Sequence, residues 1–369
     1  MKRILPFFAL MLLLTTACAR VGILDLNPRE QVLPALLSAR AGASTPYSPA
    51  EVSPLTLLHF SDLHGSCENL ERIVSFYDAY SSYIDDAIHT GDAVSCYLDD
   101  LNPWARVKGA GKIINVIGNH DCWKGHKTWA ETDIPYDATA PEAYDRFIAP
   151  YVKGWNVVQP DGVTNISSEY FGACYFYKDY LQSHVRMIVL DCMHYDTVQD
   201  SWFSEVLDDA LDRSLTVIVA EHYFAQSGLV SLDSGFSTKE SVPACQNPDL
   251  PQIECMPDAA FATMDRFIDR GGIFVCWLSG HEHEDYIGFV RGHSRQLQIL
   301  VEKAGEKDVY IHEDRTEGTV NQDAFNLVTV NPSKHLLVIQ RIGSTRGPKM
   351  RSKTLFAYDY AERTVTADE

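Results

Sequence analysis

The sequence predicts an α/β domain in which helices cover both faces of a β-sheet. Short apolar runs rich in β-branched residues alternate with helical stretches between residues 55 and 283. Such alternation is typical of sheets that are buried on both faces. The end of the chain differs, because residues 296–303, 326–342 and 353–361 read as consecutive strands without helices between them.

Most of the predicted strands are apolar runs that end in polar residues. The first spans residues 55–62, and a helical stretch at 68–83 follows it. The runs at 85–92 and 112–121 repeat this outline. Three later strands, at 185–192, 214–222 and 271–283, alternate with helices at 201–212 and 258–270. A hairpin is predicted at Asn331, Pro332 and Ser333, where turn-forming residues interrupt the last long apolar run.

The first 54 residues are predicted to be an export signal and a tether. Lys2 and Arg3 precede an apolar run at 4–14 that has signal-peptide length and is too short to span a bilayer. Residues 13–18, LLTTAC, look like a bacterial lipobox, whose cysteine is acylated and becomes the new N-terminus. Cleavage after Ala19, which would release an unanchored protein, is the alternative.

Residues 19–54 are rich in Ala, Pro and Ser and are predicted to be a flexible tether. A single folded domain is expected at 55–362. We therefore expect an exported protein of the bacterial cell envelope, anchored to a membrane through lipid on Cys18.

The composition limits the partners of this domain. The chain has 369 residues, of which 46% are hydrophobic, and a formal net charge of −19. An acidic surface repels a phosphate backbone, so no surface that binds nucleic acid is expected. An anionic small substrate would need a local cation to hold it.

Eight cysteines follow Cys18, and an oxidising compartment permits disulfide bonds among them. Cys245 and Cys255 bracket a proline-bearing loop that a disulfide bond could close. Three others read as small packing residues, although a bridge between two of them would stiffen the loops that carry them. They are Cys67, Cys96 and Cys122.

Five predicted strands end in residue types that bind metals. Open α/β sheets bind ligands at the carboxyl ends of their strands, so these side chains are expected to converge. The candidates are Asp62 and His64 in SDLHG, Asp92 in TGD, Asn119 and His120 in GNHD, His222 in AEH, and His281 and His283 in SGHEH. Any one of them alone is more often a turn former or a helix cap. The neighbouring Gly91, Gly118 and Gly280 read as ordinary loop residues.

The order of these motifs resembles that of the calcineurin-like metallophosphoesterases. The family pattern of D-x-H, G-D, G-N-H-[DE], a lone His and G-H-x-H is present in sequence order across residues 55–340. The resemblance implies a two-sheet αββα sandwich with a metal site at the carboxyl ends of the strands. It also implies a metal-dependent hydrolase that cleaves phosphoester bonds in a small phosphorylated substrate, either a monoester or a diester.

The family arrangement also implies the role of each ligand. Asp92 would bridge two metal ions, and a water that bridges them would attack as hydroxide. The first ion would be completed by Asp62, His64 and His283, and the second by Asn119, His222 and His281. Ligands of mixed nitrogen and oxygen type suit manganese, iron, zinc or nickel and do not choose among them.

His120 is not a ligand in this arrangement. It would contact a phosphoryl oxygen or protonate the leaving alkoxide, with Asp121 or Asp62 as its orienting partner. Two alternatives stay open: a surface binding lipoprotein that keeps the fold without turnover, and a dinuclear hydrolase of another bond type.

Departures from particular subfamilies narrow the expected site. The Asp-Arg-Gly of protein serine/threonine phosphatases is missing beyond Asp92, and Ser95 stands where purple acid phosphatases have a ligating tyrosine. The insertions at 123–170 and 224–257 are expected to form the rim of the pocket. The candidate phosphate contacts are Lys124, Lys127, Arg291 and Arg295, and the candidate additional site histidines are His126 and His293.

Overall fold

A computed structural model describes residues 52–98, 102–124, 138–160, 172–232, 241–244, 255–304, 322–344 and 354–368. The predicted signal peptide, Cys18 and all but the last residues of the tether lie outside these ranges. Among the described residues, no helix combines the length and the apolar character needed to cross a bilayer.

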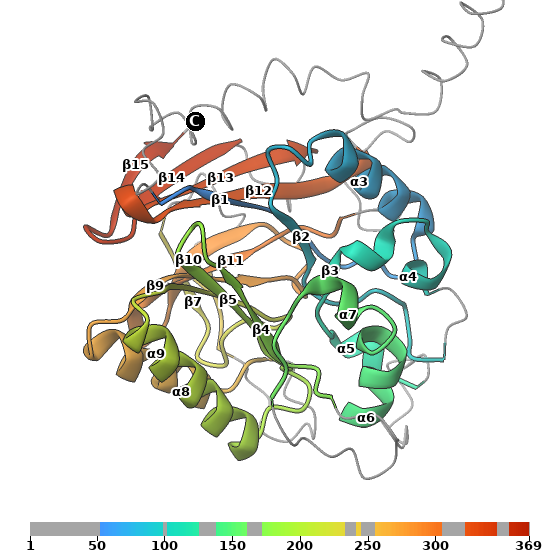
Figure 1. The fold of residues 1–369 in the computed structure, drawn as a ribbon, viewed down its shortest axis with the longest axis horizontal. Coiled ribbons are helices and arrows are strands. Elements are labelled where there is room, and N and C mark those ends of the chain that lie inside the picture. Colours follow the sequence, from blue (N-terminus) through green and yellow to red (C-terminus); the bar gives the residue numbers. More distant parts are fainter. Residues whose placement is uncertain are drawn as a thin grey trace, which may run out of the picture.

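Two β-sheets pack face to face in the described part of the chain (Figure 1). The first has the spatial order β15-β14-β13-β12-β1-β2-β3. Its strands are β1 (Leu55–Phe60), β2 (Asp86–His89), β3 (Ile114–Asn115), β12 (Ala324–Asn331), β13 (Leu336–Gly343), β14 (Leu355–Asp359) and β15 (Thr364–Asp368). The strands β1, β2 and β3 are parallel, whereas β12 to β15 form an antiparallel meander that pairs with β1.

The second sheet has the spatial order β4-β5-β6-β9-β11-β10-β7-β8. Its strands are β4 (Phe176–Tyr180), β5 (Val185–Val189), β6 (Thr216–Ala220), β7 (Leu229–Ser231), β8 (Ser241–Val242), β9 (Ile273–Ser279), β10 (Tyr286–Val290) and β11 (His293–Leu300). The central strands β5, β6, β9 and β11 are parallel. Both sheets therefore have a parallel part whose carboxyl ends can carry a shared site.

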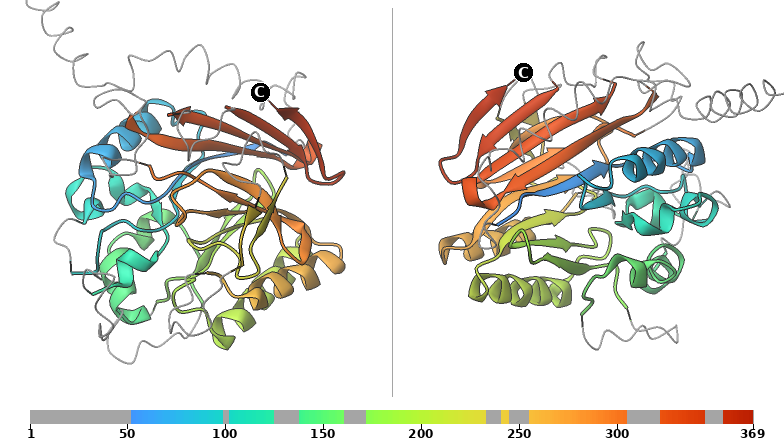
Figure 2. Two further views of the ribbon diagram at one scale, coloured as in Figure 1. Left: turned by 180° about the vertical axis from the view of Figure 1, so that it is seen from behind. Right: turned by 45° about the horizontal axis from the view of Figure 1, so that its top comes forward.

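Helices cover the outer faces of the two sheets (Figures 1 and 2). The helix α3 (Cys67–Ala79) packs on the first sheet, and α8 (Thr197–Asp212) and α9 (Asp258–Asp269) pack on the second. Short helices α4 (Pro103–Arg106), α5 (Asn119–Cys122), α6 (Ala140–Ala143) and α7 (Val152–Trp155) lie beside β2 and β3. The predicted αββα sandwich is confirmed.

Strand alternation explains the layers. Leu57 on β1 and Ile218 on β6 point into the core between the two sheets. Their neighbours Leu58 and Val219 point to the opposite faces, Leu58 into the core under α3 and Val219 into the core under α8 and α9. Full burial of each such side chain contributes about 1.5–3 kcal/mol. Both faces of these strands must therefore be apolar, which is why they read as continuous hydrophobic runs.

Several elements differ from the sequence prediction. β15 lies beyond residue 362, the predicted end of the domain, and its short segment TVTAD gives little hydrophobic signal, since its one large apolar residue, Val365, is 37% exposed. β4 was not predicted because four of its five residues are only half-buried, as befits an edge strand. α8 begins earlier than predicted, since the Asp196 side chain accepts hydrogen bonds from the backbone N–H groups of Val198 and Gln199.

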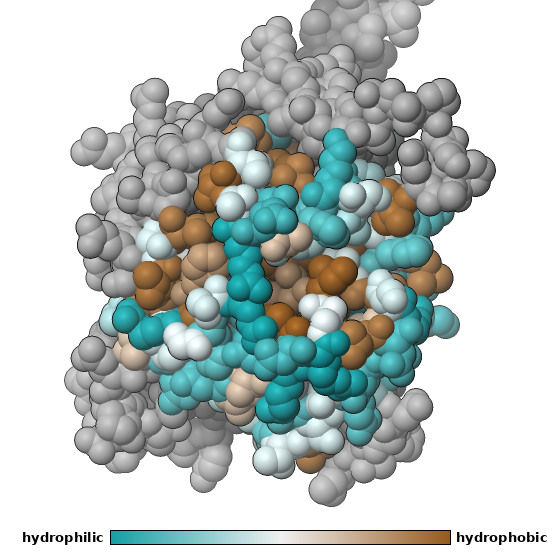
Figure 3. Space-filling model, turned by 90° about the vertical axis from the view of Figure 1, so that its left-hand side faces the viewer, coloured by the Kyte–Doolittle hydropathy of each residue, from teal (hydrophilic) through white to brown (hydrophobic). Residues whose placement is uncertain are grey.

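The end of the sandwich away from α5 has a mixed surface. Figure 3 shows hydrophobic and hydrophilic residues interspersed over that face. The polar strand ends described next lie on the side of α5 instead.

Candidate metal centre

The carboxyl ends of parallel strands from both sheets meet at one place. Asp62, Asp92 and Asn119 follow β1, β2 and β3 of the first sheet. His222 and His281 follow β6 and β9 of the second. A hydrogen bond joins the two sheets there, because His222 Nδ1 lies 2.6 Å from the carbonyl oxygen of Thr90. The carbonyl can only accept, so Nδ1 donates a proton to it, and Nε2 is the nitrogen that faces the site and could bind a metal ion in place of its own proton.

One group of candidate ligands comprises Asp62, His64, Asp92 and His283. One donor atom of each lies within 4.8 Å of the others. His64 Nε2 and His283 Nε2 are 3.0 Å apart. Two nitrogens that each lie about 2.1 Å from one ion, at right angles, are separated by about 3 Å. The spacing of the two imidazoles therefore fits adjacent positions around a single metal ion.

The second group comprises Asn119, His222 and His281. Asn119 Oδ1 lies 2.9 Å from His222 Nε2 and 3.2 Å from His281 Nδ1. Asp92 stands between the two groups, since its Oδ2 is 3.4 Å from His222 Nε2 and 3.9 Å from His64 Nε2. The structure thus brings together all seven sequence-predicted ligands, with the carboxylate of Asp92 in the middle.

The donors suit divalent or trivalent cations. Asp62 and Asp92 are almost completely buried, and Asp62 Oδ1 accepts no hydrogen bond, although His283 Nε2 lies 3.2 Å away. Burial would raise the pKa of both carboxyl groups, but His283 beside Asp62 and His222 beside Asp92 hold each pKa below its ordinary value. A buried, ionised carboxylate with an unused oxygen is the kind of group that a metal ion satisfies.

The histidines of the site differ in pKa. Burial alone would lower the pKa of His222, but Asp92 raises it to about 10. Burial lowers the pKa of His281 to about 3 and that of His64 well below its ordinary value. A cation that replaced the proton on His222 would therefore find neutral nitrogen donors and ionised carboxylates around it.

The backbone is strained at most of these ligands. Asp62, His64, Asp92, His281 and His283 have φ values of 57°, 46°, 62°, 72° and 51°. Residues other than glycine rarely adopt positive φ, and each instance costs of order 1–3 kcal/mol. Five such residues at one site indicate that the loops are held for a purpose other than stability.

Two of the glycines that were read as ordinary loop residues have a steric role. A Cβ on Gly280 would lie 1.8 Å from Ser61 Oγ and 2.6 Å from Asp62 Oδ2, so β9 can approach β1 only with glycine there. Gly91, with φ of 98°, would place a Cβ 2.3 Å from His222 Nδ1. Both glycines let a ligand loop of one sheet touch the other sheet.

One of the two predicted partners of His120, Asp121, is bonded to backbone and not to the imidazole. Asp121 instead accepts backbone hydrogen bonds from Asp92, Val94 and Gly118, at 3.0, 3.2 and 3.0 Å, and so ties the second ligand loop to the third. Burial, and next the charge of Asp92, raise the pKa of Asp121 to about 7. Its side chain is occupied by these backbone N–H groups, and His120 Nδ1 lies 2.7 Å from the carbonyl oxygen of Ser95 instead. The role of Asp121 is thus to position backbone.

A comparison with protein families agrees with this geometry. The family model described as calcineurin-like phosphoesterase matches residues 55–285, which include all seven candidate ligands. The chain belongs to the calcineurin-like phosphoesterase family. A search of curated proteins finds no significant match.

Solved structures similar to this calcineurin-like phosphoesterase are distant. A dimetal phosphatase from Danio rerio is 11% identical, with 79% of this chain and 96% of that chain covered and a TM-score of 0.46. GAP50, the anchor in the inner membrane complex of Plasmodium, is 10% identical, with 86% and 88% covered and a TM-score of 0.36. A predicted phosphoesterase from Streptococcus pneumoniae is 13% identical, with 78% and 89% covered and a TM-score of 0.29. At such low identities these proteins say nothing about the substrate.

Family membership and the cluster of aspartate and histidine ligands together support a metal-dependent phosphoester hydrolase. Sequence reasoning missed the residues that hold the ligands in place, among them Thr90, Ser95 and Gly280. Their only signal is that small residues stand directly beside a ligand motif.

Two of the four predicted phosphate contacts are paired with carboxylates, and one lies outside the described residues. Lys124 pairs with Glu142 at 2.8 Å, and Arg295 pairs with Asp265 and Asp269 at 3.3 and 2.7 Å. Arg291 lies after β10, where its backbone N–H donates to Gly228, and Lys127 is not described. Lys124 and Arg295 were predicted as phosphate contacts, but their charges are paired with nearby carboxylates.

The other candidate histidines and cysteines are paired elsewhere, lie outside the described residues or are free thiols. His293 Nδ1 lies 2.6 Å from Asp265 on α9, and His126 is not described. Cys255 is disulfide-bonded, but its predicted partner, Cys245, lies outside the described residues. The considered bridge among the cysteines near the ligand motifs is absent, because Cys67, Cys96 and Cys122 are free thiols.

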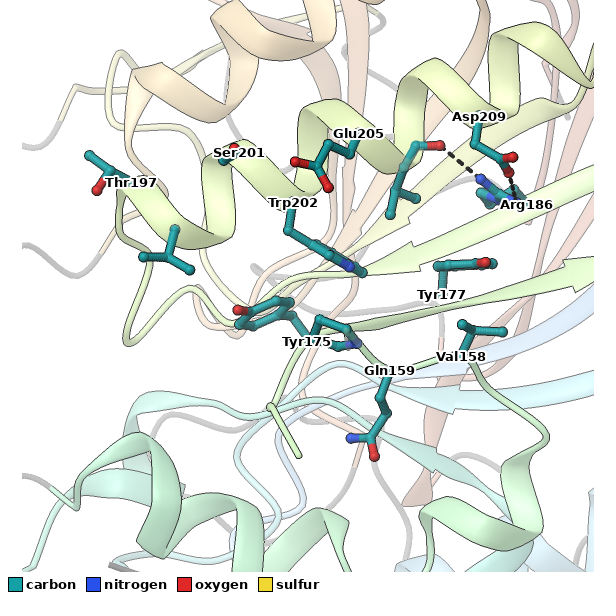
Figure 4. A pocket seen from close by; sticks show the side chains of 13 residues that line it. Val158, Gln159, Tyr175, Tyr177, Arg186, Thr197, Ser201, Trp202, Glu205 and Asp209 are labelled. Carbon is teal, nitrogen blue, oxygen red and sulfur yellow. Dashed lines mark hydrogen bonds and ion pairs between the residues drawn. The ribbon is translucent and has the colours of Figure 1, made fainter. Parts of the chain in front are cut away.

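A groove of about 630 Å³ lies apart from the ligands, between β4 and α8 (Figure 4). Tyr175 and Trp202 lie on its wall with ring centroids 4.8 Å apart. Its guanidinium group, Arg186, is buried and bonded to Asp179 and Asp209, so it holds β5 against α8. None of the seven candidate ligands lines this groove.

Proposed function

We propose that this chain hydrolyses phosphoesters at a dinuclear metal centre bridged by Asp92. The observation that carries the proposal is the position of Asp92 Oδ2, 3.4 Å from a nitrogen of one ligand group and 3.9 Å from a nitrogen of the other. A single carboxylate in that place can bind two ions at once. Bound there, such ions would lower the pKa of a water molecule and neutralise charge on phosphoryl oxygens.

The chain's own residues would orient this chemistry. The backbone N–H of His120 donates to Asp92 Oδ1 at 2.9 Å and so leaves Oδ2 to face both ligand groups. The charge of a phosphoryl group would be met by the metals, since an acidic chain with net charge −19 offers little general attraction to an anion.

His120 is placed for proton transfer or for contact with the phosphoryl group. Its Nε2 lies 3.9 Å from Asp92 Oδ2, and its side chain is 26% exposed, so a substrate can reach it beside the metals. A proton held at Nε2 would be given to the departing alkoxide oxygen, which needs it most when the alkoxide is a poor leaving group.

We further propose that the substrate is a small phosphorylated molecule and that the protein acts outside the cytoplasm. Export is supported by Lys2, Arg3 and the apolar run at 4–14. Lipid attachment is supported by LLTTAC ending at Cys18, with a tether of low complexity after it. The metals proposed are manganese, iron, zinc or nickel.

The proposal is tested by metal analysis of the purified protein together with turnover of a panel of monoesters, diesters and nucleotides. We expect two metal ions per chain and metal-dependent hydrolysis of at least one phosphoester class. His293→Asn serves as a matched control, because His293 also pairs with a carboxylate but lies away from the ligands, next to α9. Retention of at most one ion by the wild-type protein, or equal losses in Asp92→Asn and His293→Asn, would contradict a centre bridged by Asp92.

A further inference from the structure

Ser95 lies in the loop after β2 and contacts two different parts of the candidate centre. Its carbonyl oxygen lies 2.7 Å from His120 Nδ1. Its hydroxyl donates to the carbonyl oxygen of His64 at 3.0 Å. One residue that is not a ligand thus touches both the predicted proton donor and the loop of a predicted metal ligand.

The first contact determines which ring nitrogen of His120 carries a proton. A carbonyl oxygen has no hydrogen to donate, so Nδ1 must be the donor in this bond. In the neutral ring, Nε2 is therefore unprotonated and presents its lone pair toward Asp92 Oδ2, 3.9 Å away. This is the nitrogen of His120 that faces the candidate ligands.

Two ring contacts hold the imidazole of His120 in this orientation. The Trp123 ring packs against it with centroids 4.3 Å apart, and the edge of the His64 ring meets it at 4.5 Å with an interplanar angle of 89°. With Nδ1 bonded to Ser95, a flip of the ring would break the hydrogen bond and place the Cε1–H group where Nε2 now lies.

The second contact supports a strained ligand. His64 has φ of 46°, a conformation that costs free energy unless its surroundings hold it. The Ser95 hydroxyl binds the carbonyl oxygen of that same residue, and the backbone N–H of His64 donates to the carbonyl oxygen of Asp92 at 3.0 Å. Two residues of the loop after β2 therefore hold the His64 backbone by hydrogen bonds, one at its carbonyl oxygen and one at its N–H group.

We infer that Ser95 is a positioning residue of this centre: its carbonyl binds the Nδ1–H group of His120, so that Nε2 is the ring nitrogen that can take up and give a proton at the site, and its hydroxyl fixes His64 for metal binding. The inference rests on the proposed function for its purpose, but its two contacts can be measured separately.

The hydroxyl contact is tested by calorimetric titration of metal-free protein with Mn²⁺. Ser95→Ala removes the bond to His64, and Ser95→Thr keeps a hydroxyl in place. Outer partners of metal ligands typically contribute about 10–100-fold to affinity. We expect Ser95→Ala to weaken one of the two binding steps at least about tenfold, and Ser95→Thr to stay close to wild type. Unchanged binding in Ser95→Ala, or an equal loss in Ser95→Thr, would overturn this half of the inference.

The carbonyl contact is tested by ¹⁵N NMR of the histidine rings in metal-free protein at a pH where His120 is neutral. The His120 signals are identified by their loss in His120→Asn. We expect Nδ1 to be protonated and Nε2 to be unprotonated in the wild-type protein and in Ser95→Thr. A dominant Nε2–H form in the wild type would refute the assignment. This readout needs no metal, so a wild-type protein that retains at most one metal ion would contradict the proposed function while the NMR result still decides the role of Ser95 toward His120.

Discussion

Gly280 offers a direct test of whether close packing between the sheets maintains the centre. In Gly280→Ala the new Cβ would lie 1.8 Å from Ser61 Oγ and 2.6 Å from Asp62 Oδ2. Ordinary contacts need about 3.5 Å, so the strand ends must separate by roughly 1.5 Å. Ser61 is fully buried and its hydroxyl donates to the carbonyl oxygen of Thr90 at 2.9 Å, so it cannot simply rotate away.

The expected magnitude follows from this overlap. Overpacking costs about 1–3 kcal/mol, and an overlap of this size belongs at the upper end of that range. For a domain of this size we expect the melting temperature to fall by roughly 4–5 °C. Gly280 also precedes His281, whose backbone N–H donates to Asp62 Oδ2 at 3.1 Å. Displacing these two ligands should weaken Mn²⁺ binding by at least about tenfold.

The assay is thermal unfolding with and without Mn²⁺, combined with calorimetric titration. Gly154→Ala is the matched control, because its Cβ would meet no atom closer than Gly111 O at 3.8 Å and its position at the end of α7 is exposed. In the double variant Ser61→Gly/Gly280→Ala, removal of the nearest clashing atoms should restore part of the lost stability. A Gly280→Ala protein with wild-type melting temperature and wild-type Mn²⁺ affinity would refute the packing argument.

Four further predictions follow from the site, the core and the N-terminus. Asp92→Asn should keep the fold, as judged by circular dichroism, but lose hydrolysis by at least about a hundredfold, because a neutral amide cannot bridge two cations; near-normal turnover with metals replete would count against the bridge. His120→Asn should retain both metals and lose about 10²–10⁴-fold in rate on alkyl phosphates but much less on nitrophenyl esters, so equal losses on the two ester types would argue against the acid role. Burial lowers the pKa of His89 to about 4, so between its ordinary pKa and pH 4 the unfolded chain binds a proton that the native chain does not. The free energy of unfolding should therefore fall with falling pH by up to about 1.4 kcal/mol per pH unit. Urea unfolding of metal-free His89→Gln should show a shallower fall, and an identical slope in the variant and the wild type would contradict the assignment. Cys18→Ser should release the protein from the detergent phase or block its maturation, whereas recovery of unaltered protein in the soluble periplasmic fraction, beginning at Arg20 or Val21, would favour ordinary signal cleavage.

Local sequence was a good guide to the strands of the two cores and a poor guide to the edges. Strands such as β5 and β6 are buried on both faces, so every residue contributes to a continuous apolar run. β4 and β15 lie at sheet edges with half-buried or exposed residues, so neither forms the continuous apolar run by which the central strands were predicted. Their pairing depends on the neighbour that the fold supplies.

The same division applies to the site. Ligand identity could be predicted because a polar, metal-binding residue directly after a buried strand must emerge at the carboxyl edge of a sheet, whatever the rest of the fold does. The partners of His120 and Asp121 could not be predicted, because hydrogen bonds depend on loop paths that sequence spacing does not determine. Proximity along the chain suggested Asp121 for His120, but the loop after β2 brings the carbonyl of Ser95 there instead.

By itself, the sequence determined which side chains could bind metals, in which order they leave the strands, and that both faces of the central strands are buried. Only the tertiary structure decided that Asp92 stands between two ligand groups, that five ligands adopt positive φ, and that Gly280 allows one sheet to touch the other. The physical reason is the distance along the chain over which each kind of interaction acts. Hydrophobic periodicity and residue chemistry act within a few positions of the chain, whereas Asp92, His222 and His281 meet only after two sheets from distant segments have packed together.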